Sequence, residues 1–260
     1  MGIVRLFGTA FSLALRRALA YRTNLFFDVL LALVQLAASI GTIGIVFSQT
    51  GLLAGWSAGQ MLVLIGTYSL ITGLRATFLD PGLADFSEQI RDGRLDTYLL
   101  QPANSVLLAT STRHAPVALV ESVLGAGVIV LGLHELATIP SPVAVAGWSL
   151  LTLIGLLIGW ATSVGLASLA FWAPRLNLGV LHGAAWEFGR YPVDIYSRWL
   201  RRLLTFTFPV AAITTWPART LIHGPDLSIL LTAVVLAAGF TAGTALLWRL
   251  GMRRYTGATS

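Results

Sequence analysis

Long apolar runs alternate with short polar segments along most of this chain of 260 residues. Several of the runs exceed the roughly 18 apolar residues that mark a membrane-spanning helix. The pattern therefore predicts an all-α integral membrane protein that forms a single transmembrane domain over residues 1–260. Five spans follow directly from the pattern, at residues 24–48, 57–79, 105–133, 144–171 and 227–248.

The region between residues 172 and 226 offers two candidates for a further span. One covers residues 173–190, which is short and contains Glu187. The other covers residues 203–222 and is interrupted by Pro209 and Pro217, and proline disrupts the interior of a helix. Either choice gives six crossings and places both termini on one side of the membrane. The hydrophobic pattern alone leaves the choice open.

The first 23 residues precede the first span and have the pattern of an amphipathic helix. Their apolar side chains, among them Phe7 and Phe11, fall mostly on one broad side, and arginines cluster near the end of the segment. This arrangement suits a helix that lies in the membrane interface. The alternative is that residues 1–23 are a frayed start of the first span.

A charged segment separates the second and third spans, at residues 80–104. Within it, Asp85, Glu88 and Asp92 are spaced three and four residues apart, which places them on one face of a short helix. Gly93 ends this helix. Two interpretations are open: a solvated loop that lies on the membrane, or a docking element for a partner protein.

The charges are few and unevenly distributed. Charged residues make up 11% of the chain, against roughly 25% in ordinary globular proteins. Arginines concentrate in the N-terminal segment, the 80–104 loop and the C-terminus, whereas the loops 49–56 and 134–143 contain none. Basic residues mark the cytoplasmic side, so both termini and the 80–104 loop are expected there, and the net charge of +6 requires no nucleic acid as partner. If residues 173–190 cross the membrane, four arginines would lie on the extracytoplasmic side, contrary to the rule that basic residues mark the cytoplasmic side. They are Arg198, Arg201, Arg202 and Arg219.

The composition excludes several kinds of chemistry. The chain has no cysteine, so disulfides, thiol catalysis and cysteine metal sites are ruled out. Its four histidines are scattered and show no metal-ligand spacing, which argues against a membrane enzyme. ATP-driven machines need a phosphate-binding loop that contains lysine, and this chain has no lysine. If ATP drives this protein, the ATPase must be a separate chain.

Ionisable residues inside membrane spans point to function by default. Glu121 lies mid-way along the expected third span. It either holds the bundle together through Ser122 or a neighbouring helix, or it forms a polar point on a substrate path that attracts cations. The alternative function is an ion-coupled secondary transporter that acts without an ATPase. Inverted repeats and several buried acids would favour that alternative, and neither is evident.

Other polar and small residues are expected to have structural roles. Arg75, near the end of the second span, is expected to reach toward Asp80 or a lipid phosphate. Glu187 and Arg190 are three residues apart and are expected to pair. The small residues that are expected to pack helices together are Gly41, Gly44, Gly51 and Gly55.

Three stretches of the chain resemble one family of membrane proteins. The first is EQIRDGRLDTYLLQPANSVLLA, in which the shared pattern consists of Ile90-Arg91, Gly93, Leu95-Asp96, Leu99-Leu100, Pro102 and Asn104. The second is FWAPRLNLG at the end of the fourth span, and the third is GRYPVDIYSRWLRRLLTFTFPVAAITTWPARTL. The chain is similar to ABC transporter permeases of the type-2 exporter (ABC-2) class, in particular to a bacterial subfamily with six spans.

The resemblance implies an answer where the hydrophobic pattern leaves a choice. Residues 173–190 are then the fifth span, and residues 191–222 form a re-entrant hairpin on the extracytoplasmic side. Two permease subunits, identical or related, would form the substrate pathway of an exporter in the bacterial cytoplasmic membrane. This chain would bind no cofactor itself, and ATP and Mg would be held by partner ATPase subunits.

The resemblance also implies a role for the charged segment between the second and third spans. In such permeases this loop contains a coupling helix that rests in the ATPase subunit, which corresponds here to residues 85–100. We expect charged side chains to dock there and apolar side chains to support them. The charged residues are Glu88, Arg91, Asp92, Arg94 and Asp96, and the apolar ones are Leu95, Tyr98 and Leu99.

Overall fold

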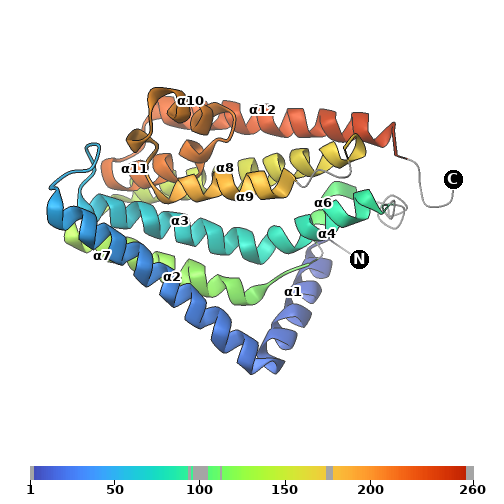
Figure 1. The fold of residues 1–260 in the computed structure, drawn as a ribbon, viewed down its shortest axis with the longest axis horizontal. Coiled ribbons are helices and arrows are strands. Elements are labelled where there is room, and N and C mark those ends of the chain that lie inside the picture. The colour runs from blue at the N-terminus through green and yellow to red at the C-terminus, as the bar shows by residue number, and fades with distance from the viewer. Residues whose placement is uncertain (1–2, 93–94, 96–104, 112, 174–177, 256–260) are drawn as a thin grey trace.

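The computed structural model describes residues 3–92, 95, 105–111, 113–173 and 178–255, and within this part of the chain the fold is helical and contains no β-strand (Figure 1). Five helical segments of these residues are long and apolar enough to cross a membrane, so the expected all-α membrane protein is confirmed. They are α2 (Arg22–Gln49), α3 (Ala58–Phe78), η1 (Pro116–Ala118) with α7 (Leu119–Glu135), α8 (Pro142–Ser168) with η2 (Leu169–Phe171), and α12 (Leu227–Met252).

The long helices run roughly along one direction, so the bundle has two ends (Figure 1). At one of them α3, α8 and α12 finish, and α4 (Asp80–Arg91) and α6 (Ser105–Ser111) pack nearby; we call this the α4 end. At the other, α2 and α7 finish beside α11 (Trp216–His223); we call this the α11 end.

Local sequence explains where two of the long helices begin. The Ser57 hydroxyl accepts a hydrogen bond from the Gln60 N–H (3.4 Å), and the Gln60 side chain accepts one from the Ser57 N–H (3.0 Å), which together start α3. Asp226 caps α12 by accepting a hydrogen bond from the Ser228 N–H (2.8 Å). These caps satisfy backbone donors that the first turn of a helix leaves free.

The centre of the bundle is α3, which packs against α7 with the two backbones almost in contact. A methyl group built on Gly66 of α3 would lie 2.6 Å from the Ile129 backbone nitrogen and 2.7 Å from the Gly125 carbonyl oxygen of α7. Only a residue without a side chain permits so close an approach. The glycines that the sequence predicts to pack helices meet no other part of the described chain within 4 Å; they are Gly41, Gly44, Gly51 and Gly55.

The third span differs from the expected continuous helix over residues 105–133. α6 ends at Ser111, residues 113–115 are not helical, and η1 and α7 then form the membrane-length segment. Pro116 explains the interruption, because proline disfavours a helical backbone at the preceding residue, and Ala115 has φ −121° and ψ 78°. Glu121 therefore lies in the first turn of α7 and not mid-way along a span.

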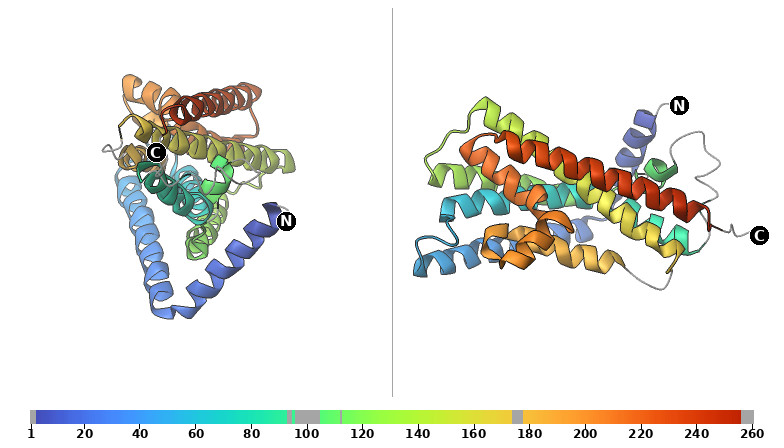
Figure 2. Two further views of the ribbon diagram at one scale, coloured as in Figure 1. Left: turned by 90° about the vertical axis from the view of Figure 1, so that its right-hand side faces the viewer. Right: turned by 90° about the horizontal axis from the view of Figure 1, so that it is seen from above.

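α1 (Ile3–Ala20) is a helix of its own. Together with α2 it forms a V whose point projects away from the other helices (Figures 1 and 2). Its other end is anchored, because Phe7 and Phe11 pack against the His114 ring and Phe11 stacks on Phe78 of α3 with ring centroids 5.8 Å apart. Burial lowers the pKa of His114, which favours the neutral ring in this aromatic cluster.

Residues 178–223 form only short helices. In order, these are α9 (Leu178–Glu187), η3 (Phe188–Arg190), η4 (Val193–Ile195), α10 (Arg198–Phe206), the π-helical η5 (Ala211–Thr215) and α11. Each is shorter than the roughly 20 residues that an apolar core of about 30 Å requires. Proline interrupts the segment at positions 192, 209 and 217. Both candidates for the fifth span, residues 173–190 and 203–222, thus contain short helices in place of one long helix.

Candidate functional site

α4 has a buried face that fixes it to the bundle. Leu83, Phe86 and Ile90 lie in an apolar cluster with residues of α8 and α12, and Phe86 packs on the α12 tryptophan ring with centroids 5.5 Å apart. A methyl group built on Gly82 would overlap the Thr110 carbonyl group of α6. Since α4 also begins just after α3 ends, it is attached to α3, α8 and α12.

A salt bridge to a buried carboxylate strengthens this attachment. The Arg113 guanidinium lies 2.7 Å from Asp85 Oδ1, and the Gln89 side chain donates a hydrogen bond to Asp85 Oδ2 (2.5 Å). Asp85 is only 8% exposed. Although its spacing groups it with Glu88 and Asp92, Asp85 ties α4 to the segment that precedes η1 and does not face solvent with them.

The described residues of the expected coupling surface fall into two groups. Glu88 and Asp92 are exposed at the α4 end. Leu95 is 1% exposed, and its N–H donates a hydrogen bond to the Tyr255 hydroxyl (2.9 Å). It therefore packs within this chain, and its expected role as apolar support for a partner stays a prediction. Arg91 belongs to α4, but its side chain lies outside the described part of the structure, as do Arg94, Asp96, Tyr98 and Leu99.

A second group of polar side chains lies inside the membrane-length part of the bundle, between α3 and α9. Arg75 pairs with Asp80 (3.2 Å), as the sequence predicts. Its guanidinium carbon also lies 4.0 Å from the ring centroid of Trp186 on α9, in a cation–π arrangement. The Trp186 Nε1 donates a hydrogen bond to the Thr72 hydroxyl of α3 (3.0 Å). α9 is thus attached to α3 through an arginine and an aromatic ring.

The predicted pair of Glu187 and Arg190 is also present (2.9 Å). Tyr68 links this pair to α3, because its hydroxyl donates a hydrogen bond to Glu187 Oε1 (3.3 Å) and the Arg190 guanidinium carbon lies 5.5 Å from its ring centroid. Glu121 of α7 lines a shallow recess together with Tyr68 and Arg190. Charged groups of α7 and η3 therefore meet on one face of the bundle.

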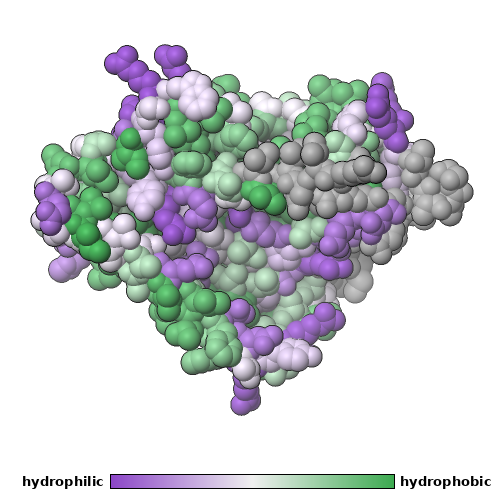
Figure 3. Space-filling model, in the orientation of Figure 1, coloured by the Kyte–Doolittle hydropathy of each residue, from purple (hydrophilic) through white to green (hydrophobic). Residues whose placement is uncertain are grey.

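Figure 3 shows hydrophilic residues running across the middle of this face, between hydrophobic regions on either side. Ser122, which the sequence offers as a partner for Glu121, donates instead to the Leu70 carbonyl oxygen of α3 (2.9 Å). Its hydroxyl thus holds α7 to α3. Glu121 itself is half-buried at the edge of the recess, where its carboxyl group can contact a molecule that enters the recess.

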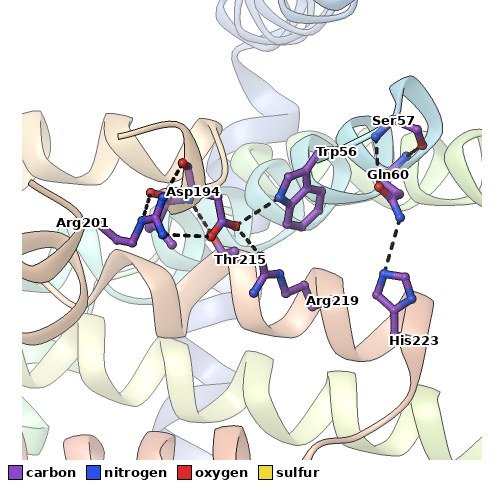
Figure 4. Close-up of polar contacts among 9 residues, drawn as sticks. Trp56, Ser57, Gln60, Asp194, Arg201, Thr215, Arg219 and His223 are labelled. Atoms are coloured by element: carbon purple, nitrogen blue, oxygen red, sulfur yellow. Dashed lines mark hydrogen bonds and ion pairs between the residues drawn. The ribbon is translucent and has the colours of Figure 1, made fainter. Parts of the chain in front are cut away.

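A third polar cluster, at the α11 end, is centred on Asp194 (Figure 4). Its carboxylate pairs with Arg219 of α11 (2.5 Å) and accepts a hydrogen bond from the Trp56 indole (3.1 Å). Arg201 of α10 donates to the Asp194 carbonyl oxygen (2.6 Å), and the Thr215 hydroxyl accepts from the Val193 N–H (3.3 Å). One residue thus joins the loop before α3 to η4, α10 and α11.

A cavity of about 440 Å³ opens beside this cluster and is lined by both polar and apolar groups. Arg219 borders it, and Gln60 and His223 approach each other across it (3.4 Å) (Figure 4). Sequence reasoning does not find Asp194, since the only signal is an acid seven residues before Arg201 in a largely apolar region. Among the residues described, no group of three or more His, Cys, Asp or Glu could hold a metal ion.

Comparison with known proteins gives one positive result. A family model described as ABC-2 family transporter protein matches residues 33–259. That match covers the long helices, the short helices of residues 178–223 and the charged segment after α3. No curated protein and no solved structure matches the chain.

Proposed function

Because this chain belongs to the ABC-2 family of transporter proteins, whose membrane subunits transport and do not bind nucleotide, we propose that it is the permease of an ATP-driven exporter. Separate ABC ATPase subunits dock on it through residues 85–100 and hold the ATP and Mg, so this chain binds no cofactor. A second permease subunit, identical or related, completes the substrate pathway. The family match gives no support to an ion-coupled transporter that acts alone.

The observation that carries the coupling proposal is the two-sided character of α4. One side is fixed to α8 and α12 by Phe86, to the segment before η1 by Asp85, and to α6 by the close approach at Gly82. The other side presents the exposed Glu88 and Asp92 at the end of the bundle. A coupling element needs both properties, because it must contact a moving partner and must stay fixed to the membrane helices of its own chain. Charge-assisted contacts are directional and suit this role.

The test is a mild-detergent purification of the tagged protein from its native membrane, followed by mass spectrometry of the retained proteins. We expect the parent to retain an ABC ATPase and a variant with Glu88, Arg91 and Asp92 changed to Ala to retain about tenfold less, since each exposed charged contact contributes up to about 1 kcal/mol. Glu135→Ala combined with Arg202→Ala is the matched control, because both residues are exposed at the α11 end. If the parent retains no ATPase, the proposal fails.

We also propose six crossings, with both termini cytoplasmic in a bacterial cytoplasmic membrane. α8 finishes at the α4 end, yet α12 starts at the α11 end, where Pro225 would contact a methyl group built on Gly147 near the start of α8 (3.2 Å). The chain must therefore return between residues 172 and 226. Residues 173–190 make this fifth crossing, and residues 191–222 form a re-entrant hairpin held by Asp194 on the extracytoplasmic side.

The middle of the face formed by α9, α3 and α2 is hydrophilic (Figure 3). We place the substrate path along this face, with the second permease subunit opposite it. Glu121 is the acid on this face that attracts a cationic, amphiphilic substrate. We expect Glu121→Gln to lower ATP-dependent transport of a fluorescent lipophilic cation into inverted vesicles by about tenfold, which corresponds to ~1.4 kcal/mol. Glu135→Gln at the other end of α7 serves as control, since it is exposed away from the recess. Equal transport by Glu121→Gln and the parent would remove Glu121 from the path.

A further inference from the structure

An apolar groove lies between α8 and α12 and has a volume of about 540 Å³. Thr207 and Phe208, which follow α10, close one of its sides. α12 lies at the edge of the molecule that is opposite to α1 and α2 (Figures 1 and 2). The groove is therefore separate from the hydrophilic face.

Glycine creates the space in this groove. Gly239 and Gly243 of α12 both line it, and a methyl group built on either would meet no atom within 4 Å. At the next residue of α12 the two helices do touch, since a methyl group on Gly165 of α8 would lie 3.0 Å from the Thr244 hydroxyl. The groove thus lies beside a true helix contact, and no side chain of α12 reaches into it at these two positions.

Two of the three threonines in the lining direct their hydroxyl groups to backbone; the third is Thr207. The Thr162 hydroxyl donates to the Ile158 carbonyl oxygen (2.8 Å), and the Thr244 hydroxyl donates to the Ala161 carbonyl oxygen (2.7 Å). Because both hydroxyl groups are bonded to backbone, they offer little to a polar ligand. The remaining lining is mostly Leu, Val, Phe and Gly, so the groove suits a flexible hydrocarbon chain.

The dimensions and the position of the groove suit a chain that enters from one leaflet. Val235 and Leu247 mark its extent along α12, a helical rise of about 18 Å. One leaflet contributes about half of an apolar core of about 30 Å. The groove ends at the α4 end beside the exposed Trp172, and tryptophan favours the membrane–water interface.

A positive charge stands at that end of the groove. Arg254 follows Leu247 by seven residues, and its N–H donates to the Gly251 carbonyl oxygen (2.9 Å), which continues the helical turn past the end of α12. Arg254 thus stands just beyond the end of α12 at which Leu247 lines the groove. Its side chain is exposed and can meet a phosphate at the membrane surface.

We propose that the groove between α8 and α12 is a binding site for an anionic phospholipid of the leaflet at the α4 end. One acyl chain lies along Gly239 and Gly243, and the phosphate lies beside Arg254. The lipid fills the groove in the surface of the bundle, on the side away from the transport path. The site requires only that α8 and α12 cross the membrane, and it holds whether or not the coupling surface is assigned correctly.

The test uses the full-length protein in vesicles that contain phosphatidylglycerol with a diazirine in one acyl chain. After irradiation, mass spectrometry locates the adducts. We expect them to be concentrated on residues 162–169 and 235–247 in the parent, and to fall about tenfold there in the Gly239→Leu/Gly243→Leu variant, equivalent to ~1.4 kcal/mol of binding free energy. Leucine favours helix over glycine and meets open space at both positions, so this variant is expected to fold.

Gly127→Leu is the matched control, because Gly127 on α7 is exposed and a methyl group there also meets nothing within 4 Å. It should leave the adducts in the groove unchanged. Arg254→Gln should reduce the preference for phosphatidylglycerol over phosphatidylcholine and leave the adduct positions unchanged; an unaltered preference overturns the placement of the phosphate. Adducts spread evenly over all lipid-facing helices, or cross-links between α12 helices of two copies in place of adducts, would overturn the site.

Discussion

Replacing Gly66 with leucine is expected to prevent α3 and α7 from packing and to destabilise the whole bundle. A side chain at this position would meet backbone atoms of α7 at 2.6 Å and 2.7 Å, and backbone cannot rotate away as a flexible side chain can. Overpacking of this kind costs about 3 kcal/mol or more. In a membrane the hydrophobic effect does not offset this lost packing energy, because lipid is as apolar as the side chains. Membrane helices associate instead through close packing.

The measurement is the melting temperature of the purified protein in mild detergent, followed by size-exclusion chromatography. Gly66→Leu should elute as aggregate or melt well below the parent, and Gly66→Ala should show a smaller loss because only one methyl group must fit. Gly127→Leu is again the control, since it lies on the same α7 but in open space. Equal melting of Gly66→Leu and Gly127→Leu would show that the close approach of α3 and α7 does not hold the bundle together.

The close packing of α3 on α7 also shows what a sequence pattern can and cannot predict here. Hydropathy predicts where the long helices lie, because burial in lipid demands about 20 apolar residues whatever the tertiary structure. Which face of a helix packs is set by neighbours far away in the sequence. Gly41 and Gly44 have a helix-packing spacing but meet no neighbour in the described chain, whereas Gly66 and Gly125 form the contact across 59 residues of sequence.

The break in the third span was only partly visible in the sequence. Pro116 and the polar residues 110–114 lie within the span expected over residues 105–133, but the contact that supports the non-helical residues 113–115 comes from elsewhere in the chain. The Ala115 N–H donates to the Thr77 carbonyl oxygen of α3 (3.0 Å), a tertiary contact that compensates for the lost helical bond. The position of Glu121 in the first turn of α7 depends on this break.

The candidate coupling residues divide in a similar way. Their charge and their place between two spans are properties of the sequence, and Glu88 and Asp92 are exposed as docking requires. Asp85 and Leu95 have the same local spacing but face inward. Asp85 pairs with Arg113, 28 residues further along the chain, and Leu95 bonds to Tyr255, 160 residues further along. No periodicity in the loop itself encodes those partners.

Replacing Asp194 with asparagine is expected to release the hairpin of residues 191–222 from the loop before α3. The change keeps the size of the side chain but removes the charge that holds Arg219 and Arg201, whose side chains are 41% and 44% exposed. Partial exposure weakens each pair, and Asp194 itself is only 19% exposed, so we expect the hairpin to be less stable by about 2 kcal/mol.

Hydrogen–deuterium exchange in nanodiscs measures this directly. Amides of α10 should exchange faster in Asp194→Asn by about thirtyfold, the equivalent of ~2 kcal/mol, while those of α3 remain as in the parent. Asp226→Asn is the matched control, because it borders the same cavity and asparagine caps a helix as well as aspartate does. Arg219→Gln should add little in the Asp194→Asn background, since both changes remove one interaction. If the α10 amides exchange equally fast in Asp194→Asn and Asp226→Asn, the Asp194 cluster does not stabilise the hairpin. The prolines at 192, 209 and 217 then hold the shape of the hairpin without the cluster.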